Sequence, residues 1–170
     1  WIFTIMSLNS NYLLHPANNM KQHSRPGVFE TNSSSTHSLV IDRNVSLLQP
    51  GPRPDENGVL VLGEHGEREF GWEIEEYSGF DSKVNYAYLM TSGYRWDTKE
   101  YKTDQPTRLS LLEKVIMEHT GAKKIEWALG SDGYVDHQSS DNDEMFENEQ
   151  SLRCFLFSPH SMVLTDNDNH

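Results

Sequence analysis

The chain has 170 residues, and 26 acidic against 14 basic side chains give it a formal net charge of −12. This charge argues against a general nucleic-acid binder, because affinity for the phosphate backbone comes from Lys and Arg side chains that displace counterions. The single cysteine, Cys154, excludes an intrachain disulfide and a cysteine-based zinc cluster within one chain, so a reducing, intracellular setting is expected.

The first nineteen residues are expected to lie outside the folded domain. Residues 1–14 lack the basic start of a signal peptide and contain too many polar side chains for a membrane-spanning helix. Met20 looks like a natural beginning. We therefore expect residues 1–19 to be a non-native or disordered extension and residues 20–170 to form a single domain, with no signal peptide, transmembrane segment or membrane partner.

The hydrophobic pattern of residues 39–74 predicts strands. Residues 39–41 form an apolar triplet typical of a short strand, and the proline-rich stretch 49–54 then breaks the chain. Residues 59–62 form a second apolar run, and residues 68–74 alternate between polar and apolar side chains. The short link between these two runs predicts an antiparallel hairpin.

Two helices follow in the pattern. The first is expected over residues 83–91, capped by Asp81 or Ser82 and stopped by Gly93. The second begins near Pro106 and ends at Gly121, with an apolar stripe between them. Residues 124–129 alternate as a strand, residues 151–157 form a short apolar helix or strand, and residues 162–164 form a closing strand. This order predicts an α+β domain with a mostly antiparallel sheet, covered on one face by two or three helices.

The most unusual stretch is a run of polar side chains, FETNSSSTHS at residues 29–38, that leads directly into the first predicted strand. Hydroxyls and successive backbone N–H groups in a tight loop can surround a phosphate, and the histidine can move a proton. We therefore expect a catalytic His37 and a set of phosphate or ligand-binding residues: Asn32, Ser33, Ser34, Ser35 and Thr36. Residues 31–38 lack the glycines and the lysine of a P-loop, so a loop that only satisfies its own backbone through Asx and Ser turns stays open.

A second candidate is the polar segment 130–141, which follows a predicted strand, as catalytic loops often do. Asp136 and His137 are its catalytic candidates. Adjacent side chains of an extended backbone point to opposite faces, so only a turn would let both bind one ion. Asp136 could instead orient a histidine such as His37. The alternative is an ordinary acidic turn.

A third candidate is the end of the chain. Asp166, Asp168 and His170 alternate, so in an extended backbone they share one face and could hold a divalent cation. Oxygen ligands favour Mg²⁺, Mn²⁺ or Ca²⁺, and histidine shifts the preference toward Mn²⁺ or Zn²⁺. The alternative is a frayed polar tail.

Three weaker features complete the set. Glu73 and Glu75 are two residues apart and could act as acid and base, although an exposed strand face explains them as well. His119 lies on the stripe of the second predicted helix, where a core or boundary histidine is expected. Cys154 has no assigned base, and we expect it to be packed in the core.

Residues 25–38 resemble the opening of a group of uncharacterised proteins encoded by tailed bacteriophages and some bacteria, which share the FETNSSSTHS string shortly after the initiator methionine. Residues 133–139 and 166–169 also resemble that group. The resemblance implies a phage or prophage accessory protein in the host cytoplasm during infection, and it supports Met20 as the natural start. It brings no established activity or catalytic residue.

Two functions of different classes remain open. The first is a small metal-assisted phosphate-ester hydrolase or nuclease-like enzyme, in which the three candidate segments meet in space. The second is a non-enzymatic acidic binding protein or inhibitor that occupies a basic surface of a host protein. A virion or assembly component is a further alternative.

Overall fold

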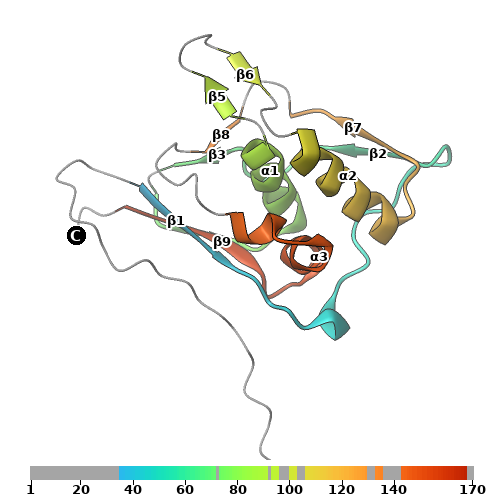
Figure 1. Ribbon diagram of the computed structural model, residues 1–170, viewed down its shortest axis with the longest axis horizontal. Coiled ribbons are helices and arrows are strands. Elements are labelled where there is room, and N and C mark those ends of the chain that lie inside the picture. Colours follow the sequence, from blue (N-terminus) through green and yellow to red (C-terminus); the bar gives the residue numbers. More distant parts are fainter. Residues whose placement is uncertain are drawn as a thin grey trace, which may run out of the picture.

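The computed structural model describes residues 35–71, 73–91, 93–95, 100–102, 106–129, 133–135 and 143–167. Within these ranges, helices and strands are mixed along the chain (Figure 1), so the α+β class predicted from the sequence is confirmed. No helix in the described ranges is long and apolar enough to cross a bilayer.

The largest sheet joins segments from the beginning, middle and end of the described chain. β1 (Ser35–Val40) and β4 (Glu75–Tyr77) flank β9 (Met162–Asn167), and both pairings are antiparallel. Burial alternates along the strands, because successive side chains point to opposite faces. Leu39 and Val163 belong to the buried inner face, whereas Val40 and Leu164 on the outer face are half-buried.

The remaining strands form three small pairs. β2 (Val59–Leu62) runs parallel to β7 (Lys124–Trp127), and β3 (Glu69–Phe70) runs parallel to β8 (Tyr134–Val135). β5 (Gly93–Arg95) and β6 (Glu100–Lys102) are antiparallel. The predicted stop of the first helix at Gly93 therefore coincides with the start of a strand.

The predicted hairpin between residues 59–62 and 68–74 is wrong, because β2 and β3 pair with β7 and β8 instead of with each other. The connecting loop is fastened to a helix. Gly66 has a φ of 81°, and a Cβ there would lie 2.6 Å from the backbone of Asp81 and Ser82. The Asn85 amide donates to the carbonyls of His65 and Glu67, at 2.8 and 2.9 Å. These contacts lead the chain away from β2 before β3 begins.

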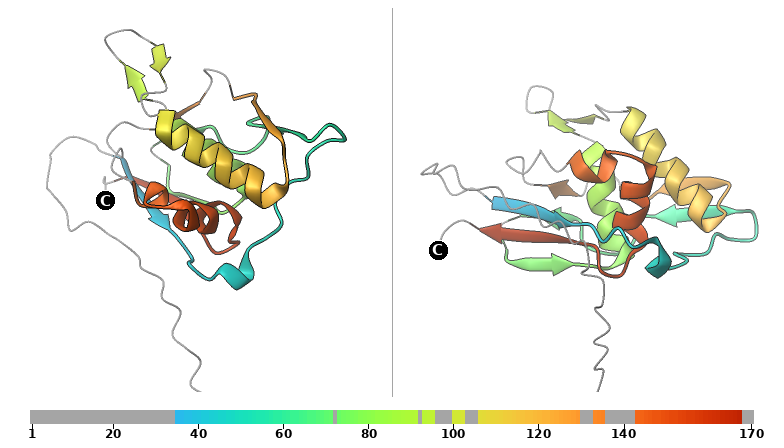
Figure 2. Two further views of the ribbon diagram at one scale, coloured as in Figure 1. Left: turned by 45° about the vertical axis from the view of Figure 1, so that its right-hand side comes forward. Right: turned by 60° about the horizontal axis from the view of Figure 1, so that its bottom comes forward.

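Three helices pack together beside the sheet (Figure 2): α1 (Phe80–Thr91), α2 (Pro106–Thr120) and α3 (Glu149–Phe157). Short 3₁₀ helices occupy Val45–Leu47 and Asp143–Phe146. Pro106 is the first residue of α2, where its fixed φ suits a helix and its missing N–H costs nothing, and Gly121 follows the helix with a φ of 77°. In α3, the Asn148 side chain accepts from the Ser151 N–H as an N-cap.

Helix α1 is buried on most of its circumference, since it contacts both other helices as well as β2 and β8 (Figure 1). Even Lys83 is buried, at 1% exposure. Its Nζ donates to the carbonyls of Ser158, at 2.7 Å, and of Ser161, at 3.2 Å. Both carbonyls belong to the turn between α3 and β9, so this lysine links α1 to the chain that enters the sheet. Burial lowers the pKa of Lys83 to about 8.

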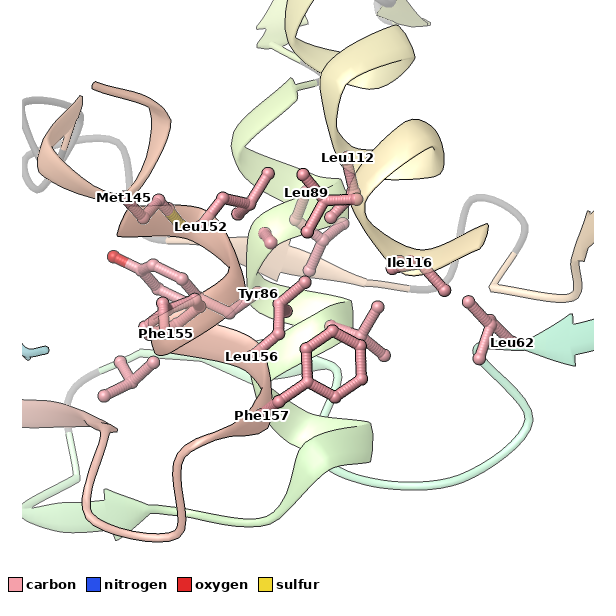
Figure 3. Close-up of a cluster of buried hydrophobic side chains, with 14 of the residues drawn as sticks. Leu62, Tyr86, Leu89, Leu112, Ile116, Met145, Leu152, Phe155, Leu156 and Phe157 are labelled. Carbon is pink, nitrogen blue, oxygen red and sulfur yellow. The ribbon is translucent and has the colours of Figure 1, made fainter. Parts of the chain in front are cut away.

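The core lies among the three helices and β2 (Figure 3). Large side chains from each element meet there, including Tyr86, Leu112, Leu152, Phe155 and Leu156. Cys154 is buried in this core, as expected. His119 is a half-buried boundary histidine, also as expected, because its ring stacks on Phe157 with the centroids 3.7 Å apart and its Nε2 lies 2.7 Å from the Gln49 carbonyl.

Candidate functional site

Strand β1 begins inside the polar motif. Residues 35–38 are the first part of the strand, so the prediction that the whole segment 31–38 forms a loop is wrong for its second half. Serine and threonine are typical of turns, but antiparallel pairing with β9 supplies hydrogen bonds for this backbone. His37 and Leu39 are buried on the inner face of the sheet, and Ser38 between them is half-buried on the outer face.

The register of β1 and β9 brings two of the predicted candidate segments together. Ser35 lies opposite Asn167, Thr36 opposite Asp166, and His37 opposite Thr165. Directly opposed residues in an antiparallel pair share a face, and their Cβ atoms are about 5 Å apart. The N-terminal polar motif and the acidic end of β9 are therefore direct neighbours.

Several predicted site residues fall outside the described residues. These are Asn32, Ser33, Ser34, Asp136, His137, Asp168 and His170. For Ser35 and Thr36 the structure describes the backbone as part of β1. The described part of the candidate site therefore consists of His37, Asp166 and the strands β1, β8 and β9, which adjoin the other predicted residues in the sequence.

The sheet separates the two described members of the predicted site. His37 lies on the inner face with Thr165, at 6% and 3% exposure, whereas Asp166 is half-buried on the outer face with Thr36 as its partner. Because the two faces of a strand point in opposite directions, a histidine and an aspartate placed in this way do not share one ion. The structure therefore does not support one compact site that contains both residues. The predicted proton-transfer residue lies on the inner face of the sheet, and the predicted metal ligand lies on the outer face.

His37 is fixed by the end of a different strand. Its Nε2 lies 3.2 Å from the carbonyl oxygen of Gly71, the residue that follows β3. Since a carbonyl can only accept, this contact assigns the proton to Nε2 and makes Nδ1 the basic nitrogen of the neutral ring. The ring centroid lies 6.1 Å from that of Tyr86, which is also in edge contact with Phe70. The imidazole is thereby held between β3 and α1.

Residues 133–135 of the second predicted segment lie close to the same place. β3 and β8 are parallel, and Phe70 pairs with Val135 at their last positions. Gly71 and the chain that continues to Asp136 consequently leave the two strands at the same edge. Because Gly71 is also the contact of His37, one hydrogen bond and one strand pair connect β1 with β8, the strand that precedes Asp136 in the sequence.

A polar row across the inner face was not predicted from the sequence. His37 of β1, Thr165 of β9 and Glu75 of β4 occupy one register across the sheet. The Thr165 hydroxyl donates to the carbonyl of Glu73. Burial, followed by a hydrogen bond and charge repulsion from Glu75, raises the pKa of Tyr77 above its ordinary value. The sequence indicated Glu75, but only strand order reveals that it lies in one row with His37 and Thr165.

The fit of a metal ion depends on residues beyond the described set. Among the described residues, no group of three or more His, Cys, Asp or Glu side chains is arranged to hold an ion. Asp166 is the described member of the predicted trio, and one carboxylate alone does not define an ion site.

Comparisons of the chain with family models, with curated proteins and with solved structures gave no match.

Proposed function

We propose that the chain is a small phosphate-ester hydrolase or nuclease-like enzyme of the phage accessory type, with His37 as the proton-transfer residue. The observation that supports this most is the contact between His37 Nε2 and the Gly71 carbonyl. This contact holds the ring beside the end of β3, and the partner strand β8 directly precedes Asp136 in the sequence. His37 itself directly follows the Ser/Thr run.

In the proposed reaction, His37 acts as a general base. A carbonyl that holds Nε2–H keeps the ring in one tautomer and stabilises the imidazolium that forms when Nδ1 takes a proton from water. The ring of Tyr86, which itself packs against Phe70, holds the imidazole in place, and burial strengthens the hydrogen bond of His37. Asp136 or His137 would complete the acid–base set, and Asn32 to Thr36 would bind the phosphate oxygens.

A divalent cation enters this proposal through Asp166, together with Asp168 and His170. Such an ion, Mg²⁺, Mn²⁺ or Zn²⁺, would neutralise phosphate charge. Because Asp166 lies on the outer face of the sheet, we propose that the cation is bound independently of His37.

Two measurements on the same proteins test this proposal. Hydrolysis of bis(p-nitrophenyl) phosphate and calorimetric titration with Mn²⁺ would compare the wild type with His37→Gln and Asp166→Asn. His160→Gln, at an exposed histidine, is the matched control. Circular dichroism and thermal denaturation would establish that each variant is folded.

The expected result is a loss of hydrolysis of about 100-fold or more in His37→Gln, with unchanged Mn²⁺ binding, since general acid–base groups contribute about 10²–10⁴-fold. Asp166→Asn should weaken Mn²⁺ binding. A wild type without hydrolysis would refute the enzymatic function, and a folded His37→Gln variant as active as the wild type would refute His37 as the proton-transfer residue. If the wild type does not bind Mn²⁺, the proposed role of a divalent cation is refuted.

A second candidate function is an acidic binding protein that occupies a basic surface of a partner, for example a host protein. The observation in its favour is the exposed segment 73–76. Three of its four residues are glutamates, and the fourth, Ile74, is 67% exposed. An apolar side chain surrounded by like charges is suited to recognition of a partner of the opposite charge.

A further inference from the structure

Strand β4 forms one edge of the sheet β1-β9-β4. It pairs with β9 on one side, and no other described strand pairs with it on the opposite side. Figure 2, right, shows β4 (green) as the lower border of this sheet. The backbone N–H and C=O groups on the outer side of a border strand can accept another strand.

The charged side chains of residues 73–76, which include the start of β4 and are called the β4 border below, are all acidic. Glu73, Glu75 and Glu76 are exposed, and their segment contains no basic residue. Ile74 has the highest exposure of the large exposed hydrophobic side chains in the described chain, at 67%. Within β4, Glu75 and Glu76 lie on opposite faces of the strand, and Ile74 directly precedes them. An incoming strand would therefore meet glutamates on both faces and one apolar anchor.

We propose that the β4 border binds an extended basic segment of a partner protein by strand addition. This inference rests on the acidic binding function proposed above and is independent of the hydrolase. Backbone hydrogen bonds to β4 would hold the segment, and alternating Lys or Arg side chains would pair with the glutamates. A second copy of β4 is the wrong occupant, because like charges opposite each other destabilise a strand pair.

The probe is a nine-residue peptide in which lysine alternates with valine, labelled for fluorescence anisotropy and titrated at low and physiological salt. Two further peptides carry backbone N-methyl groups, one on every lysine and the other on every valine. In an added strand, alternate residues point their N–H groups toward the protein. Strand addition therefore predicts that one methylated peptide binds at least tenfold more weakly, while the other binds like the parent peptide.

The variants separate the β4 border from general acidity. Glu73→Lys/Glu76→Lys should weaken binding at least tenfold, and Ile74→Ala about threefold. The matched control is Glu56→Lys/Glu126→Lys, which makes the same charge change at exposed residues beside β2 and on β7, and should keep most of the affinity. Thermal denaturation would establish that each variant is folded.

The outcomes distinguish the binding mode from the function. If both methylated peptides bind as well as the parent peptide, strand addition is refuted while acidic binding stands. The β4 border is refuted as the location if the control variant loses as much affinity as Glu73→Lys/Glu76→Lys. If none of the peptides binds the wild type at millimolar concentration, both the inference and the acidic binding function fail, and the glutamates only protect the edge from aggregation.

Discussion

Replacing Lys83 with methionine should change how the stability of the protein depends on pH. Lys83 is 1% exposed, and burial lowers its pKa from 10.5 to about 8. Holding its charge in the core at pH 7 costs about 3 kcal/mol relative to the unfolded chain, at about 1.4 kcal/mol per pKa unit. The hydrogen bonds to the carbonyls of Ser158 and Ser161 oppose this cost.

The direction of the effect follows from proton binding. Between pH 8 and 10.5 the unfolded chain keeps the Lys83 proton while the folded chain releases it, so stability rises with pH in this window. With these two pKa values, the free energy of unfolding gains about 1 kcal/mol between pH 7 and pH 9. The Lys83→Met variant lacks this gain.

The assay is urea denaturation of both proteins at intervals from pH 7 to pH 9.5. The quantity of interest is the difference in unfolding free energy between wild type and variant. Cys154 and Tyr88, whose pKa values burial raises, are present in both proteins, so their contributions cancel in the difference. A difference that stays constant across this range would mean that the two carbonyls keep Lys83 protonated, and the reasoning would be refuted.

Four further substitutions test a turn, a helix cap and the core. Gly66→Ala should destabilise the protein by about 2 kcal/mol or more in thermal denaturation, because Gly66 has a positive φ and a Cβ there would collide with the backbone of Ser82. Gly79→Ala is the control and should be nearly neutral, because no atom lies within 4 Å of a Cβ at that position. Asn148→Ala removes the N-cap of α3 and should cost about 1 kcal/mol in urea denaturation; no loss would contradict the cap. Leu152→Ala should cost about 2–5 kcal/mol, because the residue is fully buried, and a smaller loss would show that the core relaxes around the cavity.

The helices were predicted better than the strand pairs, because the signals that begin and end a helix are local. Pro106 and Gly121 bound α2 within the sequence itself. The partner of a strand, in contrast, is chosen by the whole fold. Residues 59–62 pair with residues 124–127, and nothing near β2 indicates this. The predicted hairpin failed because the intervening loop is fastened to α1.

The first helix shows a second limit of predicting burial from sequence periodicity. Apolar residues that recur with the period of a helix generally predict one buried face, but α1 is enclosed by other elements, and Lys83 and Asn85 are buried as well. Polar side chains can occupy such positions when they are hydrogen-bonded, as both are here. Their burial follows from the position of the helix in the fold, which sequence periodicity does not reveal.

The sequence predicts the candidate site as three separate segments. How these segments lie relative to one another is visible only in the structure. The polarity of residues 31–38 and of residues 166–170 is evident in the sequence, but the pairing of Thr36 with Asp166 depends on a register between distant strands. The same register separates His37 from Asp166, because a shift by one residue exchanges the faces of a strand.

The pairing of β1 with β9 also determines when the sheet can form during synthesis of the chain. β1 ends at Val40, and its partner begins at Met162. A ribosome that adds 5–20 residues per second needs roughly 6 to 24 s to make the chain between them. During this interval β1 has no partner strand, so the part of the polar motif in β1 acquires its strand partner only after synthesis has passed β9. Any nascent chain that stops before that strand leaves His37 without the sheet that positions it.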